Sequence, residues 1–133
     1  MYHAAPINEY FAPKLRIPEA GVAELRLVIR PDFHHAAGAA HGVVYFKALD
    51  DATFFAANSL VEDVFVLTVS FNLYFTRPVS EGEVVARGRV VSRSKRLYVA
   101  EGVIEDARGR EIARGSGTFM PSTMTLADLP RYR

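Results

Sequence analysis

The chain has 133 residues, half of them apolar, which suits one domain with a sizeable hydrophobic core. A net charge of +1 predicts neither strong binding to nucleic acid nor a disordered acidic chain. Because the sequence has no cysteine, disulfides, thiolate metal sites and a cysteine nucleophile are excluded.

Two further features concern the compartment and the partners of the protein. Residues 1–15 show no basic stretch followed by an apolar run, so we expect no signal peptide. No apolar run approaches the roughly 20 residues that a membrane-spanning helix needs. We therefore expect a soluble, cytoplasmic protein with one domain over residues 1–133, and with neither a membrane nor nucleic acid as a partner.

The first predicted elements are short. Residues 8–15 predict a short helix, which Pro6 and Pro13 confine. Residues 22–30 alternate between apolar and polar side chains, as a strand does. Residues 31–40 are rich in small side chains and predict a loop that leads into the next segment.

Residues 41–58, HGVVYFKALDDATFFAAN, predict a long helix that carries two adjacent carboxylates. Good helix formers dominate, and no proline or glycine follows Gly42 within the segment. One helical face holds Val43, Phe46 and Asp50, and a second face is also mostly apolar. Because a helix that is apolar nearly all round is normally buried, the acids in its middle need an explanation.

The rest of the chain predicts an antiparallel sheet. In residues 64–76 the odd positions from 65 to 75 are all apolar, which indicates a strand with those residues on a core. Turns at 77–83, 92–96 and 106–110 separate three more strands, over 84–91, 97–104 and 111–120. One strand, a helix and four strands predict an α+β fold, in which an antiparallel sheet wraps around one long central helix.

This order of elements and several short motifs resemble a known family. Residues 38–42 read Gly-x-x-His-Gly, Asp50 follows His41 by nine residues, and Phe-x-Arg-Pro at 75–78 precedes Gly-Glu at 82–83. In this order and spacing they resemble the hot-dog-fold 4-hydroxybenzoyl-CoA thioesterase superfamily, especially its phenylacetyl-CoA thioesterase-like subgroup. The resemblance covers about residues 20–120. It implies an acyl-CoA thioesterase that releases a free acid and CoA and uses no cofactor.

The resemblance implies roles for five residues. The backbone N–H of Gly42 would point at the thioester oxygen, and Asp50 would act as nucleophile or as general base toward water. Thr68 stands where a Ser or Thr often positions the water. His35 stands where the family usually has Asn, and Val43 where it usually has a second Gly, so that the start of the helix is more crowded for a substrate.

Elementary chemistry supports the same pair of groups. Thioester hydrolysis needs stabilisation of the developing oxyanion and activation of the attacking oxygen. A helix N-terminus offers unpaired N–H groups, and Gly42 permits close approach. Asp50, however, lies roughly 12 Å beyond Gly42 at 1.5 Å rise per residue. The two groups therefore meet only if two antiparallel helices share each site, which predicts a homodimer or a dimer of dimers.

Neighbouring residues have alternative readings. Asp51 points about 100° away from Asp50 and is interpreted as structural. His41 either caps and packs the start of the helix or takes part directly in catalysis. His34, His35 and His41 lack the partner acid or cysteine of a recognised metal spacing, so no metal is expected. Ser116 lacks the spacing of a serine-hydrolase nucleophile.

Two groups of residues are candidates for substrate binding. Arg93, Lys95 and Arg96 form either a solvated turn or a site for the phosphates of CoA. Residues 67–133 hold eleven bases and seven acids, whereas residues 1–66 hold five bases and eight acids, so an anion site in the second half is plausible. Aromatic side chains of the helix, Phe54 among them, suit either an aryl or a medium-chain acyl group.

Two other functions compete with hydrolysis. An acyl-CoA hydratase or dehydratase also occurs on this fold, but the order of His and Asp here has thioesterase spacing. A non-catalytic acyl-CoA-binding protein stays possible because His35 replaces the usual Asn. Hydration of crotonyl-CoA would identify the first, and stabilisation by ligand without thiol release would identify the second.

Overall fold

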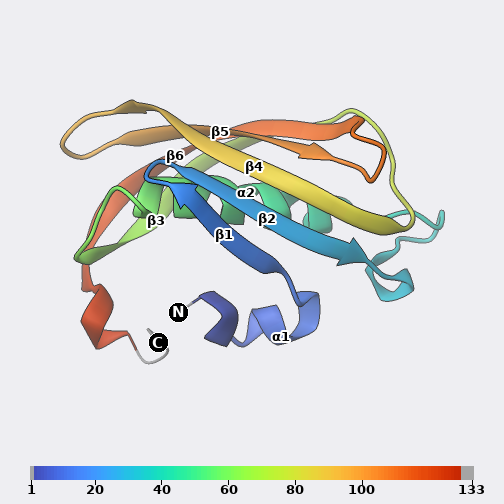
Figure 1. Ribbon diagram of the computed structural model, residues 1–133, viewed down its shortest axis with the longest axis horizontal. Helices are drawn as coiled ribbons and strands as arrows, with labels where there is room; N and C mark the ends of the chain where they lie inside the picture. Colours follow the sequence, from blue (N-terminus) through green and yellow to red (C-terminus); the bar gives the residue numbers. More distant parts are fainter. Residues whose placement is uncertain (1, 130–133) are drawn as a thin grey trace.

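The computed structural model describes residues 2–129, in which six antiparallel strands curve around one long helix (Figure 1). The helices and strands in chain order are α1 (Ile7–Phe11), β1 (Lys14–Glu19), β2 (Val22–Ile29), α2 (Gly42–Asn58), β3 (Val64–Phe75), β4 (Gly82–Arg93), β5 (Tyr98–Glu105) and β6 (Glu111–Thr125). Short 3-10 turns lie at Tyr2–Ala4 (η1), Pro31–Phe33 (η2) and Leu126–Asp128 (η3).

The sheet has the strand order β1-β2-β4-β5-β6-β3, and every neighbouring pair is antiparallel. Strands β1 and β3 are therefore its two edges. The sheet covers one side of α2, while η1, α1 and η3 lie near its other side (Figure 1). This confirms the α+β prediction of an antiparallel sheet around a central helix. Within residues 2–129, no helix is long and apolar enough to cross a membrane.

Helix α2 begins at Gly42 because His41 caps it. The imidazole Nδ1 of His41 accepts a hydrogen bond from the Val43 N–H at 2.9 Å, which satisfies one of the unpaired donors of the first turn. Along its length the helix buries Ala48, Leu49 and Ala52 against the sheet. The predicted central helix is therefore confirmed, and its start and end match the sequence interpretation almost to the residue.

Glycine in β4 lets the sheet approach α2 closely. A Cβ atom built on Gly88 would lie 2.5 Å from the backbone oxygen of Ala52, which no side chain tolerates. The helix backbone thus lies directly on the sheet at this point. This close packing fixes the distance between the sheet and the middle of α2, where residue 50 lies two residues before Ala52.

The burial of side chains along the edge strand β3 differs from the prediction. A β-bulge adds Val69 to β3 relative to its partner β6, and such an extra residue reverses which alternate residues face the core. Before the bulge, the even residues Val66 and Thr68 face α2. After it, odd residues such as Phe71 do. The prediction that all odd residues face the core is therefore wrong for Leu67 and Val69, which are 49% and 55% exposed.

The N-terminal region also differs from the prediction. Helix α1 ends at Phe11, and the chain then forms β1, a strand that the sequence pattern did not predict. Pro18 lies inside this strand, and proline is tolerated there because β1 is an edge. The later strands occur where predicted, although β4 and β6 are longer at their ends. The single-domain assignment stays a prediction.

Candidate active site

Asp50 lies at the middle of α2, and its carboxylate faces β3. Its Oδ1 accepts a hydrogen bond from the Thr68 hydroxyl at 3.0 Å. Thr68 reaches the helix because it precedes the bulge, where the even residues of β3 face inward. The structure therefore brings together two of the residues for which the family resemblance implied catalytic roles.

Burial raises the pKa of Asp50 above its ordinary value of 3.8, because a desolvated carboxylate loses the stabilisation that water gives its charge. The hydrogen bond from Thr68 acts in the opposite direction, the negative charge of Asp51 raises the pKa further, and Lys47 lowers it. A carboxylate that is poorly solvated is a stronger base than an exposed one. This environment is typical of a group that accepts a proton during catalysis.

Asp51 has a different environment, although it is the next residue. Its Oδ2 accepts a hydrogen bond from the Tyr2 hydroxyl at 2.6 Å and forms an ion pair with the Lys47 ammonium at 2.5 Å. Burial, followed by the negative charge of Asp51, raises the pKa of Tyr2, so the phenol stays protonated and donates. These contacts agree with the interpretation of Asp51 as a structural residue.

A cavity of about 520 Å³ lies beside Asp50. Its polar wall holds the Asp50, Asp51 and Thr68 side chains together with Lys47. The remaining walls are formed mainly by apolar side chains from α2, β3 and the two ends of the described chain: Tyr2, Ala5, Pro6, Ile7, Phe54, Phe55, Phe65 and Leu129, with Asn8 beside them. Cavities of this size and composition commonly bind small apolar ligands. Phe54 lies in it as a substrate-binding residue would, whereas Val43 does not line it.

Gly42 lies in a second cavity, of about 420 Å³, at the start of α2. His35, Phe75 and Arg77 also line this cavity. No described residue accepts a hydrogen bond from the Gly42 N–H, whereas the next N–H, of Val43, is occupied by the His41 cap. A Cβ atom at position 42 would lie 3.1 Å from the ring of the exposed Phe75 side chain, so any larger residue here would make that ring shift. One backbone donor is thus available at a helix N-terminus beside a cavity.

The two cavities share no lining residue, so Gly42 and Asp50 of one chain face different spaces. The separation that the helical rise predicts is therefore present in the structure. A single copy of the described chain does not hold both groups around one carbonyl. The composite site of two chains stays a prediction, and this geometry is what motivates it.

The histidines before α2 are partly engaged in the loop. His35 Nδ1 accepts a hydrogen bond from the Ala37 N–H at 3.0 Å, which leaves Nε2 for a ligand. His34 Nε2 lies 2.8 Å from the Ser80 carbonyl oxygen and donates to it. Among residues 2–129, no group of three or more histidine, aspartate or glutamate side chains is placed to hold a metal ion.

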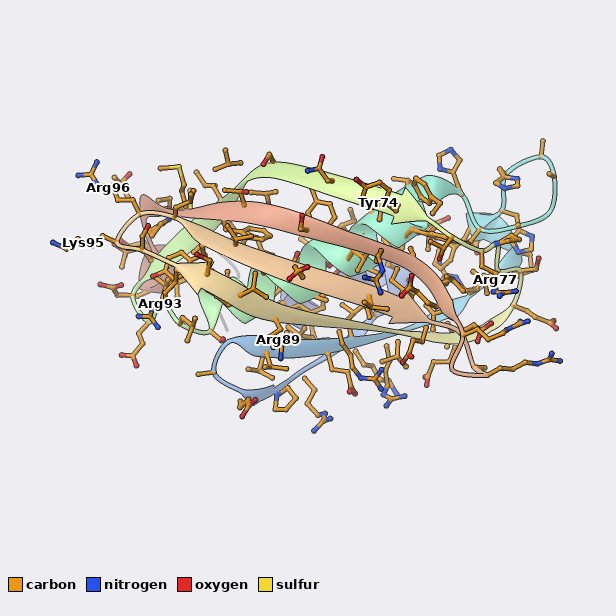
Figure 2. All side chains as sticks on the ribbon, turned by 90° about the horizontal axis from the view of Figure 1, so that it is seen from above. Tyr74, Arg77, Arg89, Arg93, Lys95 and Arg96 are labelled. Atoms are coloured by element: carbon orange, nitrogen blue, oxygen red, sulfur yellow. The ribbon has the colours of Figure 1, made fainter. Side chains whose placement is uncertain are left out.

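The basic hairpin, defined as Arg93, Lys95 and Arg96, projects from the β4–β5 turn at one end of the molecule (Figure 2). Its side chains are exposed and form no ion pair with a described carboxylate. Arg77, which lines the Gly42 cavity, lies at the opposite end (Figure 2). A hairpin that binds CoA would therefore act far from the Gly42 of its own chain, at the opposite end of the molecule (Figure 2).

Sequence reasoning missed three contributors to these cavities. Arg77 and Phe75 belong to the Phe-x-Arg-Pro motif, which placed them near the family site without giving them a role. Tyr2, which contacts the helix beside Asp50, had no local signal, since its hydrogen bond spans 49 residues of sequence.

Comparisons with known proteins are consistent with this geometry. Residues 37–113 match the family described as the thioesterase superfamily. A protein of Saccharolobus solfataricus named "Putative esterase SSO1253" is 28% identical over 102 residues, which are 77% of this chain and 68% of that protein.

Two solved structures are similar over most of the chain. A thioesterase family protein from Silicibacter pomeroyi is 28% identical, with a TM-score of 0.83 over 90% of this chain and 91% of its own. The PaaI protein from the phenylacetic acid degradation operon of E. coli has a TM-score of 0.87 over 94% of this chain and 90% of its own. At 18% identity this second likeness concerns the fold, and it confirms the hot-dog architecture.

Proposed function

The chain belongs to the thioesterase superfamily, and we propose that it is an acyl-CoA thioesterase that hydrolyses an aryl- or medium-chain acyl-CoA to a free acid and CoA. One observation carries the proposal: the half-buried Asp50 carboxylate, with a raised pKa, is held by Thr68 at the wall of an otherwise apolar cavity. A buried carboxylate is costly unless it has a use or a partner, and its neighbour Asp51 already holds the nearby cation.

The proposed reaction uses groups from two helices. The Asp50 carboxylate removes a proton from a water molecule while the water oxygen attacks the thioester carbon. The Gly42 N–H of the partner subunit donates a hydrogen bond to the oxyanion that forms. The C–S bond then breaks, and the leaving CoA thiolate takes the proton that Asp50 had accepted. In the alternative route, the Asp50 carboxylate attacks the carbon itself and the C–S bond breaks, so that the CoA thiolate leaves. Water then hydrolyses the mixed anhydride, which frees the acid and restores Asp50. Thr68 would orient the carboxylate in both routes.

The proposed dimer is supported by exposed apolar side chains on two elements. Val43 and Phe46 are exposed on α2, and Leu67 and Val69 are exposed on the face of the edge strand β3 that points away from α2. An edge strand of twelve residues with unpaired backbone groups is suited to pairing with its own copy around a two-fold axis. Such a pairing would place two α2 helices side by side and antiparallel, as the composite site requires.

The remaining residues have roles in binding or positioning under this proposal. His35 would donate from Nε2 or hold a water in the Gly42 cavity. His41 would act through the helix cap that leaves the Gly42 N–H available. Val43 and Phe54 would contact the substrate on opposite sides of the shared site, and the basic hairpin would bind the phosphates of CoA.

The decisive experiment is an acyl-CoA hydrolysis panel, monitored with a thiol reagent, on the unsubstituted protein, Asp50→Asn and Asp51→Asn. Asp50→Asn should keep the fold and lower kcat by at least about 100-fold, the effect of losing an acid–base group. Asp51→Asn should do far less, because an amide oxygen still accepts from Tyr2. Equal activity of the two variants would contradict the assignment.

Controls in the same panel distinguish the rival functions. Hydration of crotonyl-CoA without thiol release would indicate a hydratase. Thermal stabilisation by every acyl-CoA tested, again without thiol release, would indicate a non-catalytic binding protein.

A further inference from the structure

The N-terminal segment, defined as residues 2–8, contributes a wall to the Asp50 cavity. Tyr2, Ala5, Pro6, Ile7 and Asn8 all line it, beside residues of α2 and β3. In Figure 1 this segment lies near the side of α2 that the sheet leaves uncovered. A part of the chain distant in sequence from Asp50 thus lies where a substrate would be held.

Tyr2 fixes the segment to the helix next to Asp50. Its side chain is buried, its hydroxyl donates to Asp51, and its ring packs edge-on against Phe55 with 5.0 Å between ring centroids. The Lys47 ammonium lies 5.4 Å from the centre of the same ring. The wall is therefore attached by a charge-assisted hydrogen bond and by aromatic packing, as in a structural element that keeps its shape.

The segment also holds itself in place. The Asn8 side-chain amide donates to the Tyr2 carbonyl oxygen at 2.7 Å, and the Asn8 side chain is buried. The Asn8 N–H donates to the Ala5 carbonyl oxygen at 2.9 Å. These bonds fix the backbone on both sides of Pro6 and Ile7, so the position of the Ile7 side chain is determined by its neighbours.

The polar and the apolar side chains of the cavity come from different parts of the chain. Asp50 and Thr68 lie where α2 faces β3, and Asp51 and Lys47 lie beside Tyr2. The N-terminal segment adds the apolar side chains of Pro6 and Ile7. Ile7 is 55% exposed although it lines the cavity. An apolar ligand that filled the space would cover this surface and gain from removing it from water.

We propose that the N-terminal segment is the size-determining wall of the acyl site and that Ile7 limits the length of the acyl group that binds beside Asp50. The inference rests on the proposed function, because it identifies the cavity beside the catalytic carboxylate as the place of the acyl chain. The N-terminal segment would thus recognise the acyl end of the substrate, an apolar acyl chain or aryl group, and not the CoA moiety.

Two substitutions of opposite effect test the wall, and a third is the matched control. Ile7→Trp should reduce the space and Ile7→Ala should enlarge it. Ile17→Trp introduces the same ring at an isoleucine of β1 that is also exposed, at 44%, and does not line the cavity. Because both isoleucines are exposed, all three variants should melt within a few degrees of the unsubstituted protein.

The measured quantity is the ratio of kcat/KM for octanoyl-CoA to that for butanoyl-CoA. Each buried methylene contributes about fourfold to binding, so a tryptophan that displaces about two methylenes should lower the ratio by about 15-fold. Ile7→Ala should leave the ratio unchanged or raise it, and extend activity to longer chains. Ile17→Trp should leave the ratio unchanged.

A second measurement separates this inference from the proposed hydrolysis. Calorimetry with the non-hydrolysable thioethers S-octyl-CoA and S-butyl-CoA should show the same change in the ratio of Kd values. If the unsubstituted protein hydrolyses no acyl-CoA but Ile7→Trp still weakens the octyl ligand selectively, the proposed activity fails and the wall stands. The inference is overturned if Ile7→Trp changes both chain lengths equally or not at all, or if neither thioether binds the unsubstituted protein.

Discussion

Replacing Gly42 by proline should remove the proposed oxyanion hydrogen-bond donor while leaving helix α2 in place. Proline is well accepted at the first position of a helix, where its missing N–H has no intrahelical partner. His41, the preceding residue, has φ −62° and ψ 147°, the extended conformation that a residue before proline prefers. The N–H that is lost donates to no described residue, so the fold itself loses no hydrogen bond.

The new ring would contact one neighbour. A Cβ atom at position 42 would lie 3.1 Å from the tip of the Phe75 ring, so this exposed side chain must move by a few tenths of an ångström. Gly42→Ala carries the same Cβ atom and keeps the N–H, which makes it the matched control. Any loss that the two variants share reports the contact with Phe75, and the additional loss in Gly42→Pro reports the donor.

The expected magnitude follows from the chemistry of oxyanion stabilisation. Removing one donor to a developing oxyanion typically lowers kcat by about 100- to 1,000-fold. We therefore expect Gly42→Pro to lose at least about 100-fold relative to Gly42→Ala in the thiol-release assay, with a melting temperature close to that of the control.

Mixing inactive chains then tests whether the site is shared. If Gly42 of one chain works with Asp50 of another, a mixed dimer of Gly42→Pro and Asp50→Asn chains has one intact site and one doubly defective site. Random pairing of equal amounts makes half of the dimers mixed, so about one quarter of the activity should return. If both residues served one site within a chain, the coexpressed mixture would be no more active than the separate variants. That result, with mixed dimers demonstrated by two affinity tags, would refute the composite site.

Four further predictions concern the hairpin, the Asp50–Thr68 pair and the edge strand. Neutralising Lys95 and Arg96 together should raise KM for an acyl-CoA and leave kcat nearly unchanged. The same acyl group carried by a short pantetheine thiol should be hydrolysed almost normally. An equal loss on both substrates would mean that the hairpin is an ordinary solvated turn that does not bind CoA. The pH profile of kcat/KM should show activity falling, as pH decreases, around a value above the ordinary 3.8 of an aspartate, because burial raises the pKa of Asp50 and protonation removes the base. Thr68→Val should move this limb to still higher pH, since it removes a hydrogen bond that favours the carboxylate; an unchanged limb would mean that another group titrates. Val69→Asp should convert the proposed dimer to an inactive monomer, as measured by light scattering and the thiol-release assay, because it places a charge on the exposed apolar edge of β3. An active monomer would exclude the shared site.

The central helix could be predicted from the sequence because its signals are local. Apolar positions three and four residues apart, good helix formers and the absence of proline act within a few turns of the chain. The structure accordingly places α2 at Gly42–Asn58, against a prediction of 41–58. The hairpins at 92–96 and 106–110 were predictable for the same reason. The candidate site residues came from the family resemblance, since no local pattern distinguishes Asp50 from Asp51.

The tertiary structure decided what depends on pairing between distant segments. Strand β1 has little alternation of its own and exists because β2 offers it a partner along a sheet edge. The bulge at Val69 is set by how β3 fits against β6, and one inserted residue reverses the faces of everything before it. The different environments of Asp50 and Asp51 arise in the same way. Tyr2, 49 residues before Asp51, donates to one carboxylate, while Thr68 from β3 donates to the other. Periodicity describes only which neighbours along the chain share a face, and the folded chain brings these distant donors together.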